Sequence, residues 1–287
     1  MGKGGSVRSY IKPGQVPLVP ETGLRAPGGG RLLIVTPIIS GRLTPDEAIG
    51  METLRRHGGA WPHLFLHPRG LDFEFDTTGS STLALDPANF DGISAYNAML
   101  MSPWFYDLFD AYEHILIFQT DCLLLSDRIG PWLDQPWSYC GAPYFRRNGR
   151  LKSVGNGGFS LRKVADHQAV LNSAAADWGR ISGPMARQYV KGAYLRCLLR
   201  YLRRGGGGAA ALVADFDRAE DEFWIYYAPL FSPRFRLPPP EAVVGFAAES
   251  RPRRVVELNG GQLPLGAHAW MKHDRAFWDE TLASLST

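Results

Sequence analysis

The chain has 287 residues, of which 45% are hydrophobic and 21% are charged. These fractions are close to the averages for globular proteins, so they exclude a disordered chain, a collagen-like repeat and a coiled coil. With 31 basic and 28 acidic residues the formal charge is only +3, which is too balanced to indicate a nucleic-acid partner. The three cysteines are widely separated and form no C-x-x-C pair, so neither a disulfide framework nor a structural zinc site is indicated.

The sequence contains no segment typical of a membrane span or a signal peptide. No apolar run approaches the roughly 20 residues that cross a bilayer. The N-terminus also lacks the charged-then-apolar layout of a signal peptide. We therefore expect a cytoplasmic protein, with a peripheral association with membranes left open. Residues 1–30, rich in Gly and Pro, are predicted to form a flexible leader, and residues 31–287 a single domain.

The first predicted elements are a strand, a helix and a second strand. Residues 31–37 contain four consecutive aliphatic side chains and end at Pro37, which is typical of a buried strand. Thr44 is a candidate N-cap, and the proline and two acids after it predict a helix that continues to about His57. Residues 64–66 are predicted to form the next strand. This alternation favours an α/β protein.

The clearest predicted strand lies near the middle of the chain. Residues 94–112 are expected to be helical, with a break at Pro103. Residues 114–118 then form an apolar run, which ends in the polar residues 119–121. Open α/β sheets bind ligands beyond the C-terminal ends of their strands, so Asp121 is a candidate ligand-binding residue.

Three further segments complete the predicted pattern. Residues 139–144 are expected to form a strand, and the glycine-rich residues 155–162 follow it. A long helix is predicted from about residue 184 to residue 204, ended by four glycines at 205–208. Because this glycine run follows a helix and does not join a strand to a helix, we favour a mobile loop over a phosphate-binding loop.

Several common catalytic signatures do not occur in the sequence. There is no G-x-S-x-G elbow, no Walker A loop ending in Lys-Ser/Thr and no H-E-x-x-H motif. Hydrolase and P-loop interpretations are therefore disfavoured. The remaining polar groups at predicted strand ends suit the chemistry of a sugar nucleotide.

Asp121 and His268 are the candidate ligands of a divalent cation. A sugar nucleotide leaves as a diphosphate, and a bound cation stabilises the negative charge that develops on it. Asp121 follows a buried strand, which can hold its carboxylate in a fixed direction, although an Asp at this position can also cap a turn. His268 is the plausible imidazole ligand on a tight polar turn, and the alternative is a packed or solvent-facing histidine.

Two other motifs carry candidate catalytic groups. Glu220 and Asp221 open a segment that looks helical, and either carboxylate, preferably Asp221, could accept the proton of an attacking hydroxyl. Acids are also common at helix N-termini because they interact favourably with the helix dipole. Gly157 and Gly158 would let the backbone approach a donor or acceptor closely, and Asn156 would supply an amide. An ordinary turn is the alternative.

Six segments of the chain, in the same order, resemble a family catalogued as domain of unknown function 5672. That family is itself similar to GT-A-type nucleotide-diphospho-sugar transferases. The combination of the Gln119-Thr120-Asp121 motif with the later GNGGFSLR motif is more specific than either motif alone. The resemblance covers about residues 31–278, and its matching segments are residues 96–100, 115–124, 141–144, 154–162, 220–224 and 264–270.

The resemblance implies a fold, a cofactor and a set of site residues. The fold would be a GT-A-type α/β domain with a mixed, mostly parallel central sheet flanked by helices and Rossmann-like nucleotide-sugar binding. Asp121 would be the principal ligand of Mn²⁺ or Mg²⁺ and His268 would complete the metal site, with Gln119 where many GT-A enzymes have a first aspartate. The expected residues are Asp221 and Glu220 for catalysis; Thr36, Pro37, Asn97, Gln119, Thr120 and Asp121 for the donor; and Tyr144, Asn156, Gly157, Gly158, Trp224 and Trp270 for the acceptor or sugar.

The function implied is transfer of a sugar, with inversion, from a nucleotide-diphosphate donor to an acceptor hydroxyl in glycan or polysaccharide biosynthesis. The expected donor is a UDP-sugar. A retaining enzyme could use the same acids to orient its acceptor. Because Gln119 leaves the aspartate motif incomplete, the main alternative is a non-catalytic sugar-nucleotide or glycan-binding subunit of an assembly complex. A nucleotidyltransferase is less well supported, since no glycine-rich basic loop follows the first predicted strand.

Overall fold

The computed structural model describes residues 19–20, 23–180, 192–214 and 216–285. Most of the predicted leader, residues 1–18 and 21–22, lies outside the described residues. Within the described residues, no helix is long and apolar enough to cross a membrane.

A six-stranded mixed sheet forms the centre of the molecule, with the strand order β3-β2-β1-β4-β9-β6. The neighbouring pairs among the first four strands are all parallel, and β9 is antiparallel to both of its neighbours. The predicted mostly parallel α/β sheet is confirmed. The strands are β1 (Gly30–Pro37), β2 (His63–Pro68), β3 (Ser81–Leu85), β4 (Tyr112–Phe118), β6 (Tyr139–Cys140) and β9 (Phe159–Lys163).

The order of the strands places a topological switch point between β1 and β4. The chain goes from β1 through β2 to β3 on one side, and then returns to place β4 on the other side of β1. The connections therefore diverge at the C-terminal ends of β1 and β4. Open α/β sheets form their ligand crevice at this position.

Helices surround the sheet. The predicted first helix is confirmed, and Thr44 and Glu47 form a full capping box at its start. The predicted helix over 94–112 is broken at Pro103 as expected but ends earlier, because Tyr112 already begins β4. The helices are α1 (Pro45–Gly58), α2 (Gly92–Leu100), α3 (Pro103–Asp107), α4 (Gly130–Leu133), α5 (Val164–Leu171), α7 (Gly192–Arg203), α8 (Ala209–Val213), α9 (Glu220–Tyr226), α10 (Ala228–Phe231), α11 (Pro252–Leu258) and α12 (Arg275–Leu285), with short 3-10 turns at Pro87–Phe90 and Trp178–Arg180.

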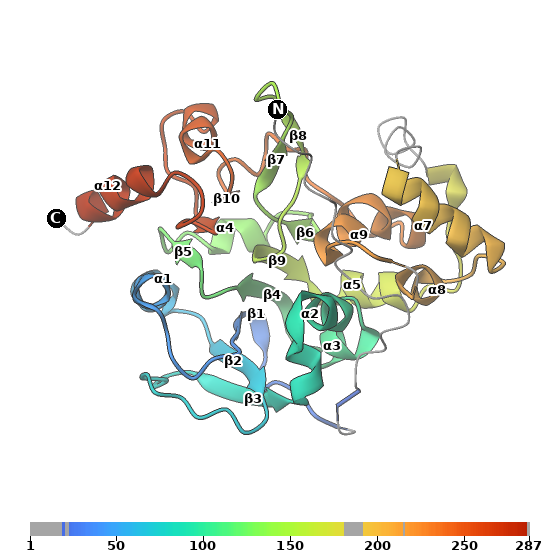
Figure 1. Cartoon of the computed structure of the whole chain (residues 1–287), viewed down its shortest axis with the longest axis horizontal. Coiled ribbons are helices and arrows are strands. Elements are labelled where there is room, and N and C mark those ends of the chain that lie inside the picture. The colour runs from blue at the N-terminus through green and yellow to red at the C-terminus, as the bar shows by residue number, and fades with distance from the viewer. Residues whose placement is uncertain (1–18, 21–22, 181–191, 215, 286–287) are drawn as a thin grey trace, which may run out of the picture.

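Figure 1 shows how these helices are distributed around the sheet. Helices α7, α8 and α9 lie at one end of the molecule, and α11 and α12 lie at the opposite end. The described part of the predicted long helix is α7, which ends close to the predicted boundary. The first part of that prediction, residues 184–191, lies outside the described residues.

Two small sheets stand beside the central one. The first joins β10 (Ala247–Ala248), β11 (Gly266–His268) and β5 (Cys122–Leu124), and it pairs His268 directly with Cys122. The prediction that His268 lies on a turn was therefore wrong, since His268 is the last residue of a strand. The second is a hairpin of β7 (Pro143–Phe145) and β8 (Leu151–Val154). The strand predicted over 139–144 is thus two strands, β6 and β7, because residues 141–142 leave the central sheet.

Candidate functional site

A cleft of about 550 Å³ opens at the switch point between β1 and β4. Its volume falls within the range of small-molecule sites. The residues immediately after β4 lie along it, as predicted from the polar end of that strand, and the start of α1 closes one side. Its lining includes Pro37, Thr44, Tyr96, Gln119, Thr120, Asp121 and Lys272.

The two predicted metal ligands lie next to each other, and Asp121 lines this cleft. Oδ1 of Asp121 is 3.2 Å from Nε2 of His268, and its Oδ2 accepts a hydrogen bond from Nζ of Lys272 at 3.1 Å. Burial alone would raise the pKa of Asp121, but the hydrogen bond and charge of His268, with those of Lys272, lower it to about 2. Burial lowers the pKa of His268, but Asp121 and Glu249 together raise it to about 9. Asp121 and His268 lie close together because β11, which ends at His268, pairs with β5, and β5 begins at the residue after Asp121.

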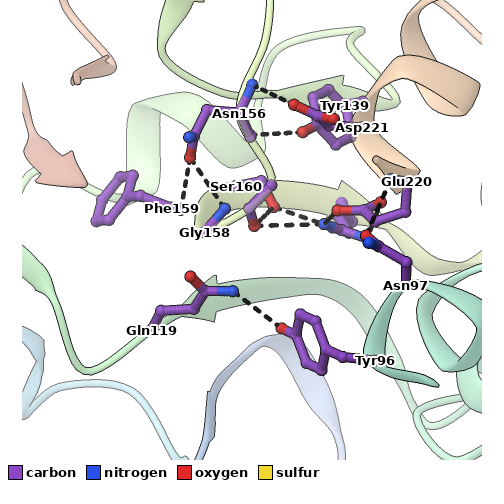
Figure 2. A network of polar contacts seen from close by, with 12 residues as sticks. Tyr96, Asn97, Gln119, Tyr139, Asn156, Gly158, Phe159, Ser160, Glu220 and Asp221 are labelled. Carbon is purple, nitrogen blue, oxygen red and sulfur yellow. Dashed lines mark hydrogen bonds and ion pairs between the residues drawn. The ribbon is translucent and has the colours of Figure 1, made fainter. Parts of the chain in front are cut away.

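Gln119 contributes an oxygen atom to the same point. Its Oε1 is 3.1 Å from Nε2 of His268, and its Nε2 donates to the hydroxyl of Tyr96 at 3.3 Å. Figure 2 shows this second contact at the end of β4. Because the amide nitrogen faces Tyr96, the amide oxygen faces His268. A Cβ atom on Gly158 would lie 2.2 Å from Nε2 of His268, so only glycine lets the backbone pass this close.

Asp121 and His268 could hold a divalent cation only together with further ligands, such as substrate oxygens. Two ligand atoms about 2.1 Å from one ion and roughly at right angles are about 3 Å apart, which is close to the 3.2 Å between Asp121 and His268. Glu249 contacts the other ring nitrogen of His268, Nδ1, at 3.3 Å, so its carboxylate does not face the space beside Nε2. No group of three or more His, Cys, Asp or Glu among the described residues could hold a metal. Mg²⁺ commonly takes one or two carboxylates and substrate phosphates, and such a site needs no third acid.

Asn156 contacts both His268 and Asp221. Its Nδ2 is 2.8 Å from Nδ1 of His268, and its backbone N–H donates to Oδ2 of Asp221 at 3.1 Å. Its Oδ1 accepts from the N–H of Gly158 at 2.9 Å, and its carbonyl accepts from the hydroxyl of Tyr139. Its φ of +58° is in the left-handed region, which asparagine tolerates better than most residues. Figure 2 shows Asn156 between these partners.

Asp221 is a buried carboxyl group whose pKa lies near neutrality. The hydroxyl of Tyr144 donates to its Oδ2, and the N–H of Glu222 donates to its Oδ1 at 2.8 Å. Burial raises the pKa of Asp221 to about 7, with a further contribution from the negative charge of Glu220. A carboxyl group with such a pKa is suited to accept and release a proton at neutral pH.

Glu220, by contrast, is held in a buried ion pair. Its Oε1 and Oε2 accept from Nη2 and Nη1 of Arg162 at 2.7 and 3.1 Å, and Arg162 is completely buried. The backbone N–H of Glu220 donates to Oδ1 of Asn97 at 3.0 Å. Figure 2 shows this contact beside the ion pair. A buried arginine requires such a partner, because an unpaired charge inside a protein is very costly.

The structure places two predicted donor-binding residues outside the cleft. Thr36 is completely buried, and its hydroxyl is 2.8 Å from Nε2 of His63. Asn97 is also buried and receives the N–H of Glu220. Each is adjacent in sequence to a residue that does line the cleft, Pro37 and Tyr96. Neighbouring residues on a strand or helix point in different directions, which explains both placements.

Two predicted sugar-binding residues are also buried. Trp224 and Trp270 are completely buried in the hydrophobic core, so neither ring offers a face to a ligand. Trp224 packs against His167, with ring centroids 4.4 Å apart. In contrast, Tyr144 is half-buried and contacts Asp221, as described above.

Sequence reasoning missed four residues that contribute to the site. Tyr96 and Arg162 lie within segments that the analysis singled out, but nothing in the pattern distinguished them from their neighbours. Lys272 is a lone cation just after a matching segment. Glu249 follows β10, a strand of only two residues that carries no recognisable pattern.

Comparisons with known proteins complete the description of the site. The profile of a family described as "Protein of unknown function (DUF5672)" matches residues 80–268. No curated protein matches the chain. The chain is similar to the structure of galactosyltransferase LgtC in complex with donor and acceptor sugar analogs, with 10% identity, 88% of this chain and 94% of that chain covered, and a TM-score of 0.47. It is also similar to the bifunctional glycosyltransferase WbbM (10% identity, 85% and 46% covered, TM-score 0.41) and to glycosyltransferase GlyE of Streptococcus pneumoniae TIGR4 (10% identity, 84% and 55% covered, TM-score 0.37).

Proposed function

We propose that this chain, which belongs to the family described as protein of unknown function (DUF5672), is a glycosyltransferase that moves a sugar from a nucleotide-diphosphate donor to an acceptor hydroxyl. One observation carries the proposal. Asp121 and Gln119 line the switch-point cleft and contact His268, and Asn156 links His268 to Asp221, a buried carboxyl group with a pKa of about 7.

In this proposal the donor occupies the cleft with its diphosphate near Asp121. Lys272 contacts Asp121 and supplies a positive charge at that point. Asp121 and His268 would hold Mn²⁺ or Mg²⁺, with the oxygen of Gln119 beside them. When bound, the cation neutralises charge on the leaving diphosphate. Glu249 would orient His268 through Nδ1, a role that carboxylates commonly have beside metal-binding histidines. A UDP-sugar is the donor that we propose.

The acceptor would approach from the side of Asp221. This carboxylate would take the proton of the attacking hydroxyl, and its pKa near neutrality suits that step. Tyr144 and the N–H of Asn156 would hold it in place. Because both oxygens of Glu220 are bound to Arg162, Asp221 is the better candidate of the two acids. We propose inversion because Asp221 is available as a base for a direct attack of the acceptor hydroxyl.

The experiment that tests the proposal is donor hydrolysis. The purified chain is incubated with Mn²⁺ and a panel of nucleotide sugars, and release of the nucleoside diphosphate is measured. An enzyme releases it slowly from at least one donor even without an acceptor. Release at the background rate from every donor, together with nucleotide binding, would support the alternative of a non-catalytic sugar-nucleotide-binding subunit. Release of pyrophosphate would indicate a nucleotidyltransferase instead.

A further inference from the structure

The β7–β8 hairpin and the start of α11 carry a group of cations without acid partners. Four lie on the hairpin and the fifth precedes α11, and all five are exposed. None of them forms an ion pair with any acid in the described parts of the chain. We call these residues the hairpin cluster: Arg146, Arg147, Arg150, Lys152 and Arg251.

Several arginines elsewhere in the described residues pair with an acid. They include Arg253 and Arg254, which closely follow Arg251 in sequence. Without the five cluster residues, 26 of the 31 basic residues remain, against 28 acidic ones. Without the cluster the formal charge would be −2, so the net positive charge of the chain depends on these five residues. The paired arginines include Arg25 with Asp110, Arg31 with Asp134, Arg42 with Glu74, Arg55 with Glu52, Arg253 with Asp274 and Arg254 with Glu257.

The backbone holds the cluster in a defined arrangement. At the tip of the hairpin, the N–H of Gly149 donates to the carbonyl of Arg146 at 3.0 Å, and the N–H of Arg150 donates to Oδ1 of Asn148 at 3.2 Å. Arg251 has a φ of +60°, in the left-handed region, and its guanidinium donates to the carbonyl of Arg147 at 3.3 Å. A non-glycine residue in that region is strained, and such strain occurs preferentially at functional sites.

The hairpin extends from the proposed base. The hydroxyl of Tyr144, in β7, donates to Asp221. Nζ of Lys152, in β8, lies 6.0 Å from the ring centroid of Tyr144 and 5.6 Å from that of Tyr226. No residue of the hairpin cluster lines the donor cleft. An acceptor whose reacting hydroxyl lay between Asp221 and the donor could therefore extend its remaining part along the hairpin, where Lys152 lies near Tyr144.

We propose that the hairpin cluster binds a phosphate or carboxylate group of the acceptor, so that the acceptor is an acidic saccharide. Guanidinium groups bind both kinds of oxyanion through paired hydrogen bonds, which explains why arginine predominates in the cluster. Neutral sugars offer no such partner. The inference rests on the proposed function in one respect, namely that the acceptor approaches Asp221.

The test measures acceptor binding without any donor. Fluorescently labelled oligosaccharides of equal length, one neutral, one phosphorylated and one containing uronic acid, are titrated with the chain, and anisotropy is recorded. The double variant Arg147→Ala/Arg150→Ala is compared with Arg25→Ala/Arg55→Ala, which removes the same charge from exposed arginines that have acid partners. Unfolding curves of both variants confirm that they fold.

We expect the wild-type chain to bind at least one acidic saccharide clearly more tightly than the neutral one. Each cluster arginine removed should weaken that binding about fivefold, as for an exposed ion pair. The control variant should bind as the wild type does. The saccharide that binds more tightly identifies the group, phosphate or carboxylate.

Two results would overturn the inference. One is equal binding of neutral and acidic saccharides by the wild-type chain, and the other is equal weakening in the two double variants. Failure of the proposed function is visible separately, because donor hydrolysis uses no acceptor. If acidic saccharides bind at the cluster but no donor is hydrolysed, the anion-binding site is supported and the proposed glycosyltransferase activity is rejected.

Discussion

The backbone N–H of Asn156 donates to Oδ2 of Asp221 at 3.1 Å, while the side chain of Asn156 contacts His268 at 2.8 Å. A single residue therefore positions the proposed base and the proposed metal ligand relative to each other. Its left-handed backbone brings the two contacts together, since an extended residue would direct its N–H and side chain differently.

Two substitutions of Asn156 should separate its backbone role from its side-chain role. Asn156→Gly keeps the N–H to Asp221 and tolerates the φ of +58°, but removes the contacts with His268 and Gly158. Asn156→Ala removes the same contacts and also strains the backbone by about 1 kcal/mol or more. We expect Ala to be less stable than Gly in denaturant unfolding, with equal losses of metal-dependent nucleotide affinity. Equal stability would show that the left-handed conformation is not required.

Asp121→Ala should abolish most metal-dependent binding of a nucleoside diphosphate. The substitution removes one of the two cation ligands, so affinity for UDP in the presence of Mn²⁺ should fall by about 100-fold or more. Thermal unfolding with and without UDP and Mn²⁺ measures this, since a ligand at 100 times its Kd adds about 2.7 kcal/mol of stability. Asp110→Ala is the matched control, because Asp110 is an exposed acid paired with Arg25. An Asp121→Ala chain stabilised as much as the wild type would remove Asp121 from the site.

Glu249→Gln should weaken cation binding without removing a ligand. Glu249 contacts Nδ1 of His268 at 3.3 Å, and loss of such an orienting carboxylate typically costs 10- to 100-fold in metal affinity. Titration of Mn²⁺ into the chain with UDP present, followed by electron paramagnetic resonance, measures that affinity directly. Glu257→Gln, at an exposed acid paired with Arg254, should have no effect. If both substitutions leave Mn²⁺ affinity unchanged, Glu249 does not orient His268.

Part of the fold and of the site could be predicted from the sequence alone. The uninterrupted apolar runs of β1 and β4 identify buried parallel strands, and the Thr44 capping box identifies α1, because both signals are local. The position of Asp121 beyond β4 follows from the same reasoning. The contact between Asp121 and His268 could not be derived, because it depends on the pairing of the three-residue strands β5 and β11. Such strands are too short for a periodic pattern.

The orientation of single side chains was a second limit. The sequence identifies Trp224 and Trp270 as parts of matching segments, but burial depends on which face of each element packs against the core. Asn97 lies on α2 beside Tyr96, and one helical step of about 100° places it toward Glu220, away from the cleft. Glu220 and Asp221 are also neighbours, but Arg162 binds Glu220 whereas Tyr144 and the N–H of Asn156 bind Asp221.

The stability of the chain should depend on pH through Asp221. The pKa of this carboxyl group is raised from its ordinary value to about 7, so the folded state holds a proton that the unfolded state releases. Its contribution to stability is complete below pH of about 4 and is lost as the pH rises to about 7, by up to about 1.4 kcal/mol per pH unit. Asp221→Asn removes this dependence on pH. The free energy of unfolding of the variant, relative to that of the wild type, should therefore increase from pH 5 to pH 8. Denaturant unfolding at both pH values measures it, and an identical difference in free energy between variant and wild type at the two pH values would contradict the raised pKa.

The same substitution should affect catalysis differently from binding. A base must be ionised, so transfer by the wild-type chain should increase as the pH rises through about 7. Asp221→Asn should lose most of kcat while affinity for UDP with Mn²⁺ remains close to that of the wild type. A parallel loss of nucleotide affinity would assign Asp221 to the donor site instead.

Glu220 should behave as a structural residue although it is adjacent to Asp221. Glu220→Gln leaves the charge of Arg162 buried without its carboxylate, and breaking a buried ion pair in this way costs about 3–5 kcal/mol. Asp221→Asn places a neutral group in the same buried surroundings and should cost far less. Adding Arg162→Met to Glu220→Gln removes the orphaned charge, so the double variant should recover much of the lost stability. Denaturant midpoints of the two single variants and the double variant measure the coupling. If Glu220→Gln unfolds at the wild-type midpoint but loses transfer, Glu220 and not Asp221 supplies the base.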